Sequence, residues 1–501
     1  MAQTNTATPA APTAAAVPNA APAARPAPAP ASSNDAGDPY DVVVIGAGPG
    51  GYIAAFRAAQ NGLRTAVIER EWVGGVCLNV GCIPSKALLR NAAVVRTIHD
   101  AKTYGVEVGE VKADYGMAVD RSRQVVARIV KGLEFLFRKH KVDLVRGEAT
   151  LAAKDTISVT SQDGGKRDVK TKNVIIATGA RPRLFPGMEV DGERVMHVWQ
   201  LIVDRAKPER IVIVGGGVIG CEMATVFRSY GCEVTIVEAM DRLLGGREDP
   251  KITQLLQRSF EKQGMKLLTG AKVESAKRSG DVARIIYTKD GKQETIEADR
   301  CLIAVATQPN TENLGLDQLG VQLDRGYVKV DQKMATNVPG VWAIGDVANT
   351  PMGLAHVASA EGHLVADAIA GKIVHPLKYN DMPRPIFSHP QVAAVGLTEA
   401  QAKEQGYEVK IGEFPFSALG KAVAENDFEG VVRLVVDAKY GEILGCHIIG
   451  PEATELLSQV TPYKVLEGTS RELIDTVVSH PTLSESIKIA ATVAEGESLE
   501  I

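Results

Sequence analysis

Two glycine-rich segments constrain the fold of this chain more than any other feature. In each, an apolar, β-branched run leads into G-x-G-x-x-G, and a helical pattern follows. The first turn contains Gly46, Gly48 and Gly51, and the next apolar run ends at Glu69. This order of strand, glycine turn, helix, strand and acid is typical of a dinucleotide-binding βαβ unit. It predicts an α/β fold with a doubly wound parallel sheet.

The same pattern recurs with Gly215, Gly217 and Gly220, and Glu238 takes the place of Glu69. Both acids lie 23 residues after the first glycine of their turn. The first glycine permits the tight bend, the second admits a pyrophosphate, and the third lets helix and strand pack closely. The helix N-terminus offers N–H donors to phosphates, and the acid can accept ribose hydroxyls. Two copies with matched spacing predict two dinucleotide sites.

The acid at the second site indicates which dinucleotide binds there. Glu238 would repel a 2′-phosphate, and no basic residue directly follows it in the sequence. Because NADP carries that phosphate and NAD does not, we expect NAD at the second site.

Cys77 and Cys82 form the only tight pair among six cysteines. An ideal helix separates residues i and i+5 by about 7.5 Å along its axis. A disulfide needs Cα atoms roughly 4.4–6.8 Å apart, so a bridge here requires a distorted turn, which Gly81 makes inexpensive. We therefore predict a reducible disulfide near a helix start, where the helix dipole favours thiolate. A metal site and two unpaired core cysteines are the alternatives, and no second Cys/His pair stands at comparable spacing.

The segment "GGVCLNVGCIPSK", taken with the two glycine turns, resembles the flavin-dependent pyridine nucleotide–disulfide oxidoreductases. The similarity runs from about Tyr40 to the C-terminus, and it is strongest to the branch of the family that oxidises dihydrolipoamide. The resemblance implies FAD at the first turn and NAD at the second. It also implies that Cys77 exchanges with the substrate while Cys82 faces the flavin.

Three further segments extend the resemblance. "NVIIATGARP", with Thr178 and Gly179, resembles the strand and turn by which the chain leaves the flavin domain. "VWAIGDVANTPMGLAHVASAEG" resembles a second flavin segment, in which Asp346 would contact the ribityl or phosphate region. A helix starting near Ala355 would aim its N-terminus at the isoalloxazine ring.

Lys86 and Glu222 match a family pair that lies beside flavin N5. The resemblance implies that this pair tunes the charge of the flavin, and a purely structural ion pair is the alternative.

His480 is the candidate base among nine histidines. It stands in "HPTLSES", and the resemblance implies that Glu485 orients it and that it acts on the other subunit. A histidine with a pKa near 6.5 suits thiol deprotonation at neutral pH. Thr482 and Glu485 also form a capping-box pattern, so Glu485 has a second reading as a helix cap. One glutamate can serve both purposes.

The expected organisation has an Ala/Pro-rich extension, two dinucleotide domains and an α+β C-terminal domain. The extension is read as disordered, with a tether in a larger assembly as the alternative. The expected boundaries are 1–38 for this tail, 39–182 for the first part of the FAD domain, 183–312 for the NAD domain, 313–380 for a central segment that completes the FAD site, and 381–501 for the interface domain.

Composition narrows the partners. A formal net charge of −4 argues against nucleic-acid binding, and no apolar window is long enough for a membrane span, so any membrane association would require a partner. Few cysteines suggest a reducing compartment, and we expect a cytoplasmic enzyme. The resemblance implies a homodimer that serves lipoyl domains and the acyltransferase core of 2-oxo acid dehydrogenase complexes, or a glycine cleavage complex. The alternatives are a glutathione- or mercuric-reductase-like enzyme and a non-catalytic assembly or membrane-associated flavoprotein.

Three positions depart from the usual family pattern. Val76 replaces a commoner threonine before the first cysteine, and Ala306-Thr307-Gln308 replaces a commoner Gly-Arg-Arg. "LLGGREDP" replaces an acidic-apolar helix start after Arg242. None of these departures touches the proposed redox residues.

Overall fold

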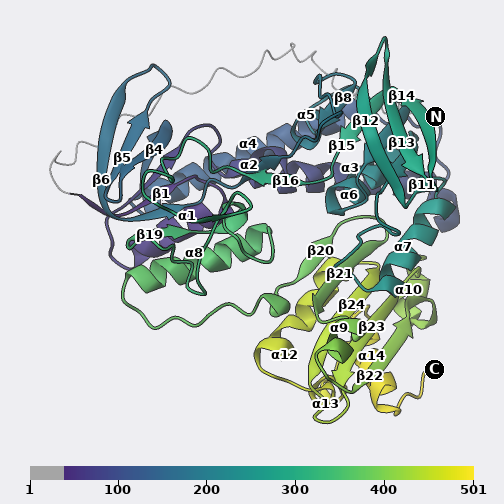
Figure 1. Cartoon of the computed structure of the whole chain (residues 1–501). Helices are drawn as coiled ribbons and strands as arrows, with labels where there is room; N and C mark the ends of the chain where they lie inside the picture. Colours follow the sequence, from purple (N-terminus) through teal and green to yellow (C-terminus); the bar gives the residue numbers. More distant parts are fainter. Residues whose placement is uncertain (1–38) are drawn as a thin grey trace, which may run out of the picture. The chain divides into compact units, whose positions relative to one another are not determined.

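The first glycine turn lies at the carboxyl edge of a seven-stranded sheet in the computed structural model, which describes residues 39–501. The Ala/Pro-rich tail expected at residues 1–38 lies outside the described residues. The strand order is β3-β2-β1-β6-β5-β4, and β19 also pairs with β6. Figure 1 shows β4, β5 and β6 side by side in this sheet. The bounds are β1 Tyr40–Ile45, β2 Thr65–Glu69, β3 Asp143–Arg146, β4 Glu148–Ala153, β5 Thr156–Thr160, β6 Lys166–Ile176 and β19 Val341–Ala343.

Strand β1 is buried on both faces, as expected for a central parallel strand. Val42 and Val44 pack in one core cluster with apolar residues of α1 (Pro49–Gln60). Val43 and Ile45 pack in another, together with apolar residues of the antiparallel ribbon β4–β6. The continuous apolar run in the sequence therefore reflects burial on two sides. It fixes the first glycine turn at the end of a rigid strand.

The second glycine turn lies in a parallel five-stranded sheet of order β11-β10-β9-β15-β8. A three-stranded antiparallel sheet, β12-β13-β14, is inserted before β15. The chain passes between the first and second sheets through β7 and β16, which pair with each other. The bounds are β7 Ala180–Pro182, β8 Val195–His197, β9 Arg210–Val214, α6 Val218–Ser229, β10 Glu233–Val237, α7 Pro250–Lys262, β11 Lys266–Leu268, β12 Ala271–Ser279, β13 Val282–Lys289, β14 Lys292–Ala298, β15 Arg300–Ile303 and β16 Thr307–Pro309.

The C-terminal part of the chain forms an antiparallel sheet of order β20-β21-β24-β23-β22. Helix α14 (Glu485–Glu495) packs on β22 and β23, and Figure 1 shows it beside these strands. The strands are β20 Arg384–Ile386, β21 Gln391–Gly396, β22 Val409–Pro415, β23 Val431–Asp437 and β24 Ile443–Gly450. The strand–turn–strand predicted from "EGVVRLVVDAKYGEILGCHIIG" is the hairpin β23–β24.

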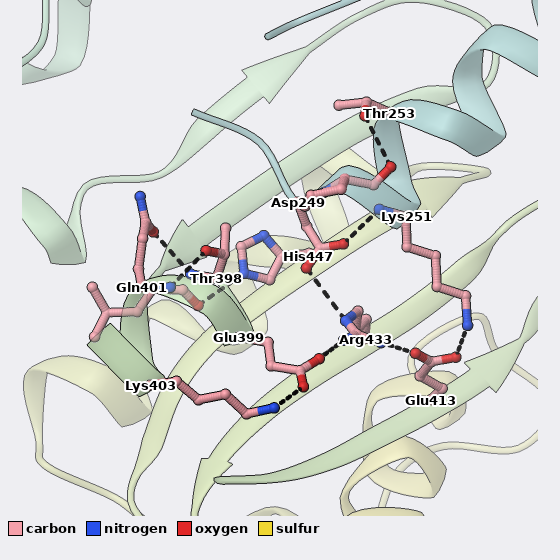
Figure 2. A network of polar contacts seen from close by, with 12 residues as sticks. Asp249, Lys251, Thr253, Thr398, Glu399, Gln401, Lys403, Glu413, Arg433 and His447 are labelled. Atoms are coloured by element: carbon pink, nitrogen blue, oxygen red, sulfur yellow. Dashed lines mark hydrogen bonds and ion pairs between the residues drawn. The ribbon is translucent and has the colours of Figure 1, made fainter. Parts of the chain in front are cut away.

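A buried polar network attaches α7 to this C-terminal sheet (Figure 2). Arg433, on β23, pairs with Asp249, which caps the start of α7 by accepting the Lys251 N–H at 2.9 Å. Arg433 also pairs with Glu399 and Glu413. Because a buried arginine is costly unless it is paired, these carboxylates determine where α7 can sit. The departure "LLGGREDP" ends at this junction.

The expected architecture of two doubly wound units and an α+β C-terminal unit is confirmed. None of the helices formed by residues 39–501 has both the length and the apolar character of a bilayer span. The other elements are α2 Gly75–Val80, α3 Cys82–His99, η1 Ala101–Tyr104, α4 Tyr115–Lys139, α5 Val198–Leu201, β17 Leu323–Asp324, β18 Tyr327–Val328, η2 Gly345–Val347, α8 Ala355–Ile369, η3 Tyr379–Asp381, α9 Glu399–Glu404, η4 Phe416–Ala418, α10 Gly420–Ala424, α11 Ala453–Leu456, η5 Leu457–Gln459, α12 Thr461–Val465 and α13 Ser470–Asp475.

Candidate functional site

The three glycines of the first turn differ in whether the fold itself excludes a side chain at their positions. Gly46 has φ +107°, and a Cβ there would lie 2.3 Å from the carbonyl oxygen of Ala177. A Cβ at Gly51 would lie 2.0 Å from the carbonyl oxygen of Gly46. A Cβ at Gly48, in contrast, would meet no protein atom within 4 Å. The fold itself requires glycine at the first and third positions, and only a group that approaches the backbone requires it at the second.

Glu69 is buried at the end of β2 and organises the same turn. One carboxylate oxygen accepts the N–H of Ala47 at 2.7 Å. The other accepts the N–H groups of Glu71 at 2.8 Å and Trp72 at 3.0 Å. A pocket of about 360 Å³ opens beside this acid and Gly46. It lies at the carboxyl ends of β1 and β2, where doubly wound sheets bind their ligands.

Thr178 lines this pocket, and Gly179 follows it at the start of the passage to the second sheet. The Thr178 hydroxyl donates to the carbonyl oxygen of Asn310 at 2.7 Å, and the Asn310 amide donates back at 2.9 Å. The Asn310 N–H donates to the Gly179 carbonyl oxygen at 2.9 Å. These bonds hold the wall of the pocket against the returning strand β16.

The second glycine turn repeats the geometry of the first. Gly215 has φ +109°, a Cβ at Gly220 would lie 2.0 Å from the Gly215 carbonyl oxygen, and a Cβ at Gly217 would meet no atom within 4 Å. Glu238 accepts the N–H of Gly216 at 2.6 Å with one oxygen and that of Met240 at 2.7 Å with the other. The chain therefore contains two matching sites for a group that approaches its backbone.

Cys77 and Cys82 form a disulfide with Cα atoms 4.6 Å apart. The predicted distortion is confirmed, because α2 ends at Val80, α3 begins at Cys82, and Gly81 alone separates them. A Cβ at Gly81 would lie 3.0 Å from the carbonyl oxygen of Val76, so a larger residue would force the two helices apart. Both cysteines are half-buried, which leaves the bridge within reach of other molecules.

Lys86 lies one helical turn after Cys82 and joins the two dinucleotide units. Its ammonium donates to both oxygens of the buried Glu222 carboxylate, each at 2.9 Å. The same Glu222 accepts the N–H of Phe387 at 3.1 Å, and the Lys86 ammonium lies 4.4 Å from the centre of the Phe387 ring. A third segment of the chain thus fixes the pair beside the disulfide.

Asp346 lies in η2, close to the start of α8. Burial raises the pKa of its carboxyl group. Within residues 39–501 its carboxylate forms no hydrogen bond, so its acceptors remain available for an external hydroxyl donor. Helix α8 begins at Ala355, as predicted, and no side chain caps it. Its first N–H groups are also free to interact with a ligand.

Glu485 contacts His480 as expected, and it also accepts one of the two hydrogen bonds of the predicted capping box. The imidazole Nδ1 lies 2.8 Å from one Glu485 oxygen, and the other oxygen accepts the Thr482 N–H at 2.8 Å. Burial raises the pKa of Glu485, but the hydrogen bonds from Thr482 and His480 outweigh it and leave the pKa below its usual value. The imidazole is 80% exposed, so its second nitrogen faces outward.

The full capping box predicted at Thr482 is wrong. Helix α14 begins at Glu485 with Ser484 as its N-cap, and the Thr482 hydroxyl donates to the carbonyl oxygen of Ser479 at 2.7 Å. Only the bond from the Thr482 N–H to Glu485 is present, because the Thr482 hydroxyl is used by the Ser479 carbonyl oxygen.

The predicted catalytic residues lie in two separate places within the chain. The disulfide and the Lys86–Glu222 pair share one region, whereas His480 and Glu485 belong to the C-terminal unit, where α14 packs on β22, β23 and α13. Within residues 39–501 no hydrogen bond joins His480 to either cysteine of the disulfide. A catalytic base from a second copy of the chain agrees with this separation.

Sequence reasoning missed four residues around these groups: Asn79, Phe387, Glu361 and Tyr379. The Asn79 amide donates to the carbonyl oxygens of Val73 and Gly75, both at 2.9 Å, and so closes the turn that contains Cys77. An amide two residues after a reactive cysteine was a usable signal. Glu361 was also detectable as an acid flanked by the small residues Ala360 and Gly362, whereas Phe387 and Tyr379 act through contacts that no local pattern reveals.

These residues fit two dinucleotides, one at each glycine turn. Each glycine turn leaves space where its second glycine stands, and each helix that follows starts without a side-chain cap. Asp346 supplies an unpaired acceptor, and Glu69 borders a pocket beside the first turn. The predicted FAD and NAD sites therefore agree with the donor and acceptor groups that the chain presents.

Comparisons with known proteins agree with this geometry. Residues 40–362 match the model of the pyridine nucleotide-disulphide oxidoreductases, and residues 382–491 match their dimerisation domain. Dihydrolipoyl dehydrogenase of Rhizobium etli is 44% identical over 92% of this chain and 99% of its own length. That of Mycobacterium tuberculosis is 46% identical over 90% and 97%.

A solved structure gives the same result. The crystal structure of LpdA from Mycobacterium tuberculosis superimposes with a TM-score of 0.84 and 28% identity, covering 90% of this chain and 98% of that one. The resemblance read from the motifs is confirmed over the sheets, the disulfide segment and the C-terminal unit. The chain belongs to the pyridine nucleotide-disulphide oxidoreductases and carries their dimerisation domain.

Proposed function

We propose that this protein oxidises protein-bound dihydrolipoamide to lipoamide, with FAD as its prosthetic group and NAD⁺ as electron acceptor. The observation that carries the proposal is the Cys77–Cys82 disulfide, which lies one helical turn from Lys86 of the Lys86–Glu222 pair and, in the sequence, between the two glycine turns. Relatives at 44% and 46% identity are named dihydrolipoyl dehydrogenase, which supports the choice of substrate.

The disulfide receives the electrons of the substrate in two thiol exchanges. A substrate thiolate attacks the Cys77 sulfur, the S–S bond breaks, and its electron pair leaves with Cys82 as a thiolate. The second substrate thiolate then attacks the sulfur that the substrate shares with Cys77. The cyclic disulfide product departs, and Cys77 remains as a thiol. Two electrons and two protons pass from the dithiol to the enzyme.

His480 of a second copy of the chain accepts the substrate proton. Because Glu485 binds Nδ1, the neutral imidazole carries its proton there and presents Nε2 as the acceptor. The carboxylate also stabilises the imidazolium that forms. The dimer is therefore required for activity, and the dimerisation domain at residues 382–491 supports this requirement.

We assign the cofactor contacts from the geometry of the two turns. Bound FAD supplies an acceptor for the electron pair of the Cys82 thiolate, and bound NAD⁺ supplies the final hydride acceptor. The Lys86–Glu222 pair places a cation beside Cys82. The assigned residues for FAD are Gly46, Gly48, Gly51, Glu69, Lys86, Thr178, Gly179, Asp346 and Ala355, and those for NAD and the flavin-side pair are Gly215, Gly217, Gly220, Glu222 and Glu238.

The remaining predictions stand as parts of this proposal. The domain boundaries are 39–182, 183–312, 313–380 and 381–501. The dithiol arrives on a lipoyl domain of a 2-oxo acid dehydrogenase complex, at its acyltransferase core, or on the carrier of a glycine cleavage complex. The other four cysteines are free buried thiols, as is common in reducing compartments, and we place the enzyme in the cytoplasm.

One paired assay tests the proposal. Purified protein is supplied with dihydrolipoamide and NAD⁺, and in parallel with NADPH and glutathione disulfide. We expect rapid NADH formation in the first assay and no turnover in the second. Turnover only with NADPH and glutathione disulfide would move the chain to the glutathione-reductase branch. Turnover in neither assay would contradict the proposed substrate.

A further inference from the structure

The carboxylate of Glu361 is fully buried on α8 and has no part in the thiol or proton chemistry described above. A buried carboxylate is costly unless hydrogen bonds satisfy it. One oxygen accepts a backbone N–H and the other accepts a phenol O–H, and the side chain of Thr350 also interacts with the carboxyl group. Such an acid has a defined orientation, so the groups that it binds are held in place.

The first bond reaches the segment that contains Asp346. One Glu361 oxygen accepts the Gly345 N–H at 2.6 Å. Gly345 opens η2 in a left-handed conformation, with φ +68°, and Asp346 follows it directly. The direction of the Asp346 side chain depends on this one backbone turn. Glu361 is the side chain that fixes it.

The second bond reaches the linker to the C-terminal unit. The Tyr379 hydroxyl donates to the other Glu361 oxygen at 2.8 Å. Tyr379 begins η3, and Asp381 at the end of η3 lies 3.4 Å from the ammonium of Lys464, whose side chain is buried on α12. The orientation of Glu361 is therefore anchored to the C-terminal unit.

The two acids lie close enough to affect each other. Burial raises the pKa of Glu361, and the neighbouring Asp346 carboxylate adds to the rise. Like charges repel in a buried site, so keeping the two acids close together requires that the backbone between them be held. The Gly345 bond and the left-handed turn provide this restraint. The arrangement holds in place a carboxylate that forms no hydrogen bond within residues 39–501.

We propose that Glu361 is a positioning residue for FAD: it holds the Gly345 turn so that Asp346 accepts a hydroxyl of the ribityl chain, and Tyr379 fixes its orientation. The inference rests on the proposed contact between Asp346 and FAD. It extends the flavin site to a residue that never touches the cofactor and to the linker between units. Loss of either bond should loosen FAD without affecting the disulfide.

The test measures FAD release from the purified holoprotein by the recovery of flavin fluorescence. Glu361→Leu removes the bonds to Gly345 and Tyr379 together with the Thr350 interaction, and we expect about a hundredfold weaker FAD binding. Tyr379→Phe removes only the outer bond and should weaken binding about fivefold. Glu361→Gln keeps an oxygen for the Gly345 N–H, and we expect it to restore binding to within about threefold of the parent protein.

Two controls separate positioning from a general loss of stability. Asp249→Asn alters another buried carboxylate, in the Arg433 network, and should lower the unfolding temperature without changing FAD affinity. The flavin absorption spectrum should shift in Tyr379→Phe, because the ribityl contact moves, and should not shift in Asp249→Asn.

The outcomes are distinct. Unchanged FAD affinity in Asp346→Asn would remove the proposed contact, and this inference with it. Weak binding in Asp346→Asn, with parental affinity in a folded Glu361→Leu, would overturn the inference alone. If Glu361→Leu does not fold, parental affinity and spectrum in Tyr379→Phe overturn it. None of these results depends on dihydrolipoamide turnover, which tests the proposed function separately.

Discussion

The two glycine turns are nearly identical in backbone and differ in what surrounds them. Their first glycines have φ +107° and +109°, and a Cβ at either third glycine would lie 2.0 Å from a carbonyl oxygen. Yet α1, behind the first turn, packs on α8, whereas α6, behind the second, packs on α3. About thirty neighbouring residues determine the geometry of each turn. Which chemistry takes place beside a turn depends on the helix that packs on the helix behind it, α8 for the first turn and α3 for the second.

The segments after each unit show the same contrast. The first is followed by α2 and α3, which carry the disulfide. The second is followed by α7, which the Arg433 network attaches to the C-terminal sheet (Figure 2). One copy of the motif is therefore adjacent to the sulfur chemistry, and the other is fixed to the unit that forms the dimer.

Removal of the disulfide should have the largest effect and leave both turns intact. In Cys82→Ser the S–S bond cannot form, so we expect dihydrolipoamide oxidation to fall by more than about a thousandfold. Bound FAD should remain, because neither turn changes. Steady-state assays with dihydrolipoamide and NAD⁺, together with the flavin absorbance, check this. Substantial residual turnover would show that electrons bypass the pair.

Matched substitutions in the turns should separate the two cofactors. In Gly51→Ala and Gly220→Ala the new methyl group collides with a carbonyl oxygen, and the backbone must shift. We expect binding to weaken about ten- to a hundredfold at the altered site only. FAD content should fall in the first variant, and the KM for NAD⁺ should rise in the second. If both variants lost the same cofactor, the assignment of the two turns would be wrong.

Substitution of Glu69 or Glu238 should also affect one cofactor and not the other, with a smaller effect than the glycine substitutions. Glu238→Gln replaces an oxygen that accepts a backbone N–H, and we expect the KM for NAD⁺ to rise about tenfold. Glu69→Gln is the matched control, and it should weaken FAD retention while the KM for NAD⁺ stays constant. Steady-state kinetics and flavin release measure the two effects. Equal responses to NAD⁺ would contradict separate sites.

The smallest expected effect concerns the pocket beside the first turn, where Arg181 pairs with Glu312. The hydrogen bonds from Arg181 lower the pKa of Glu312 from 4.5 to about 2. The folded carboxylate thus binds its proton less readily than the unfolded one. Its stabilisation is present above about pH 4.5 and is lost as the pH falls toward 2. The contribution is small because Glu312 is half exposed.

Urea unfolding between pH 5 and pH 2.5 checks this on the parent protein and Glu312→Gln. We expect the stability of the parent to fall slightly more steeply than that of the variant. Parallel slopes would show that the pair contributes nothing.

Features set by neighbouring residues could be predicted from the sequence. The spacing of the glycines and acids predicted both turns, and the rise of a helix predicted the break at Gly81. The family resemblance predicted the start of α8 near Ala355. The capping box at Thr482 failed because Ser484 starts the helix. Thr482 and Ser484 are both possible N-cap residues in this segment, and the helix uses Ser484.

Features set by distant segments could not be predicted. Phe387 meets Glu222 from 165 residues away, and Tyr379 reaches Glu361 from the linker. Arg433 collects carboxylates from three different elements. Nothing in the residues around Phe387 or Arg433 specifies their partners, because these contacts exist only after the sheets have packed.

The uncapped helix starts at Gly48 and Gly217 have a consequence for engineering. Serine would fit at either position, cap the helix and stabilise the protein without its cofactors by about 0.5 kcal/mol. The same hydroxyl would occupy the space and the N–H groups that a pyrophosphate uses. Selection for heat resistance alone would favour serine at both positions, and cofactor binding and activity would be lost. Under the proposed assignment, a serine at either position would therefore exchange cofactor binding for stability.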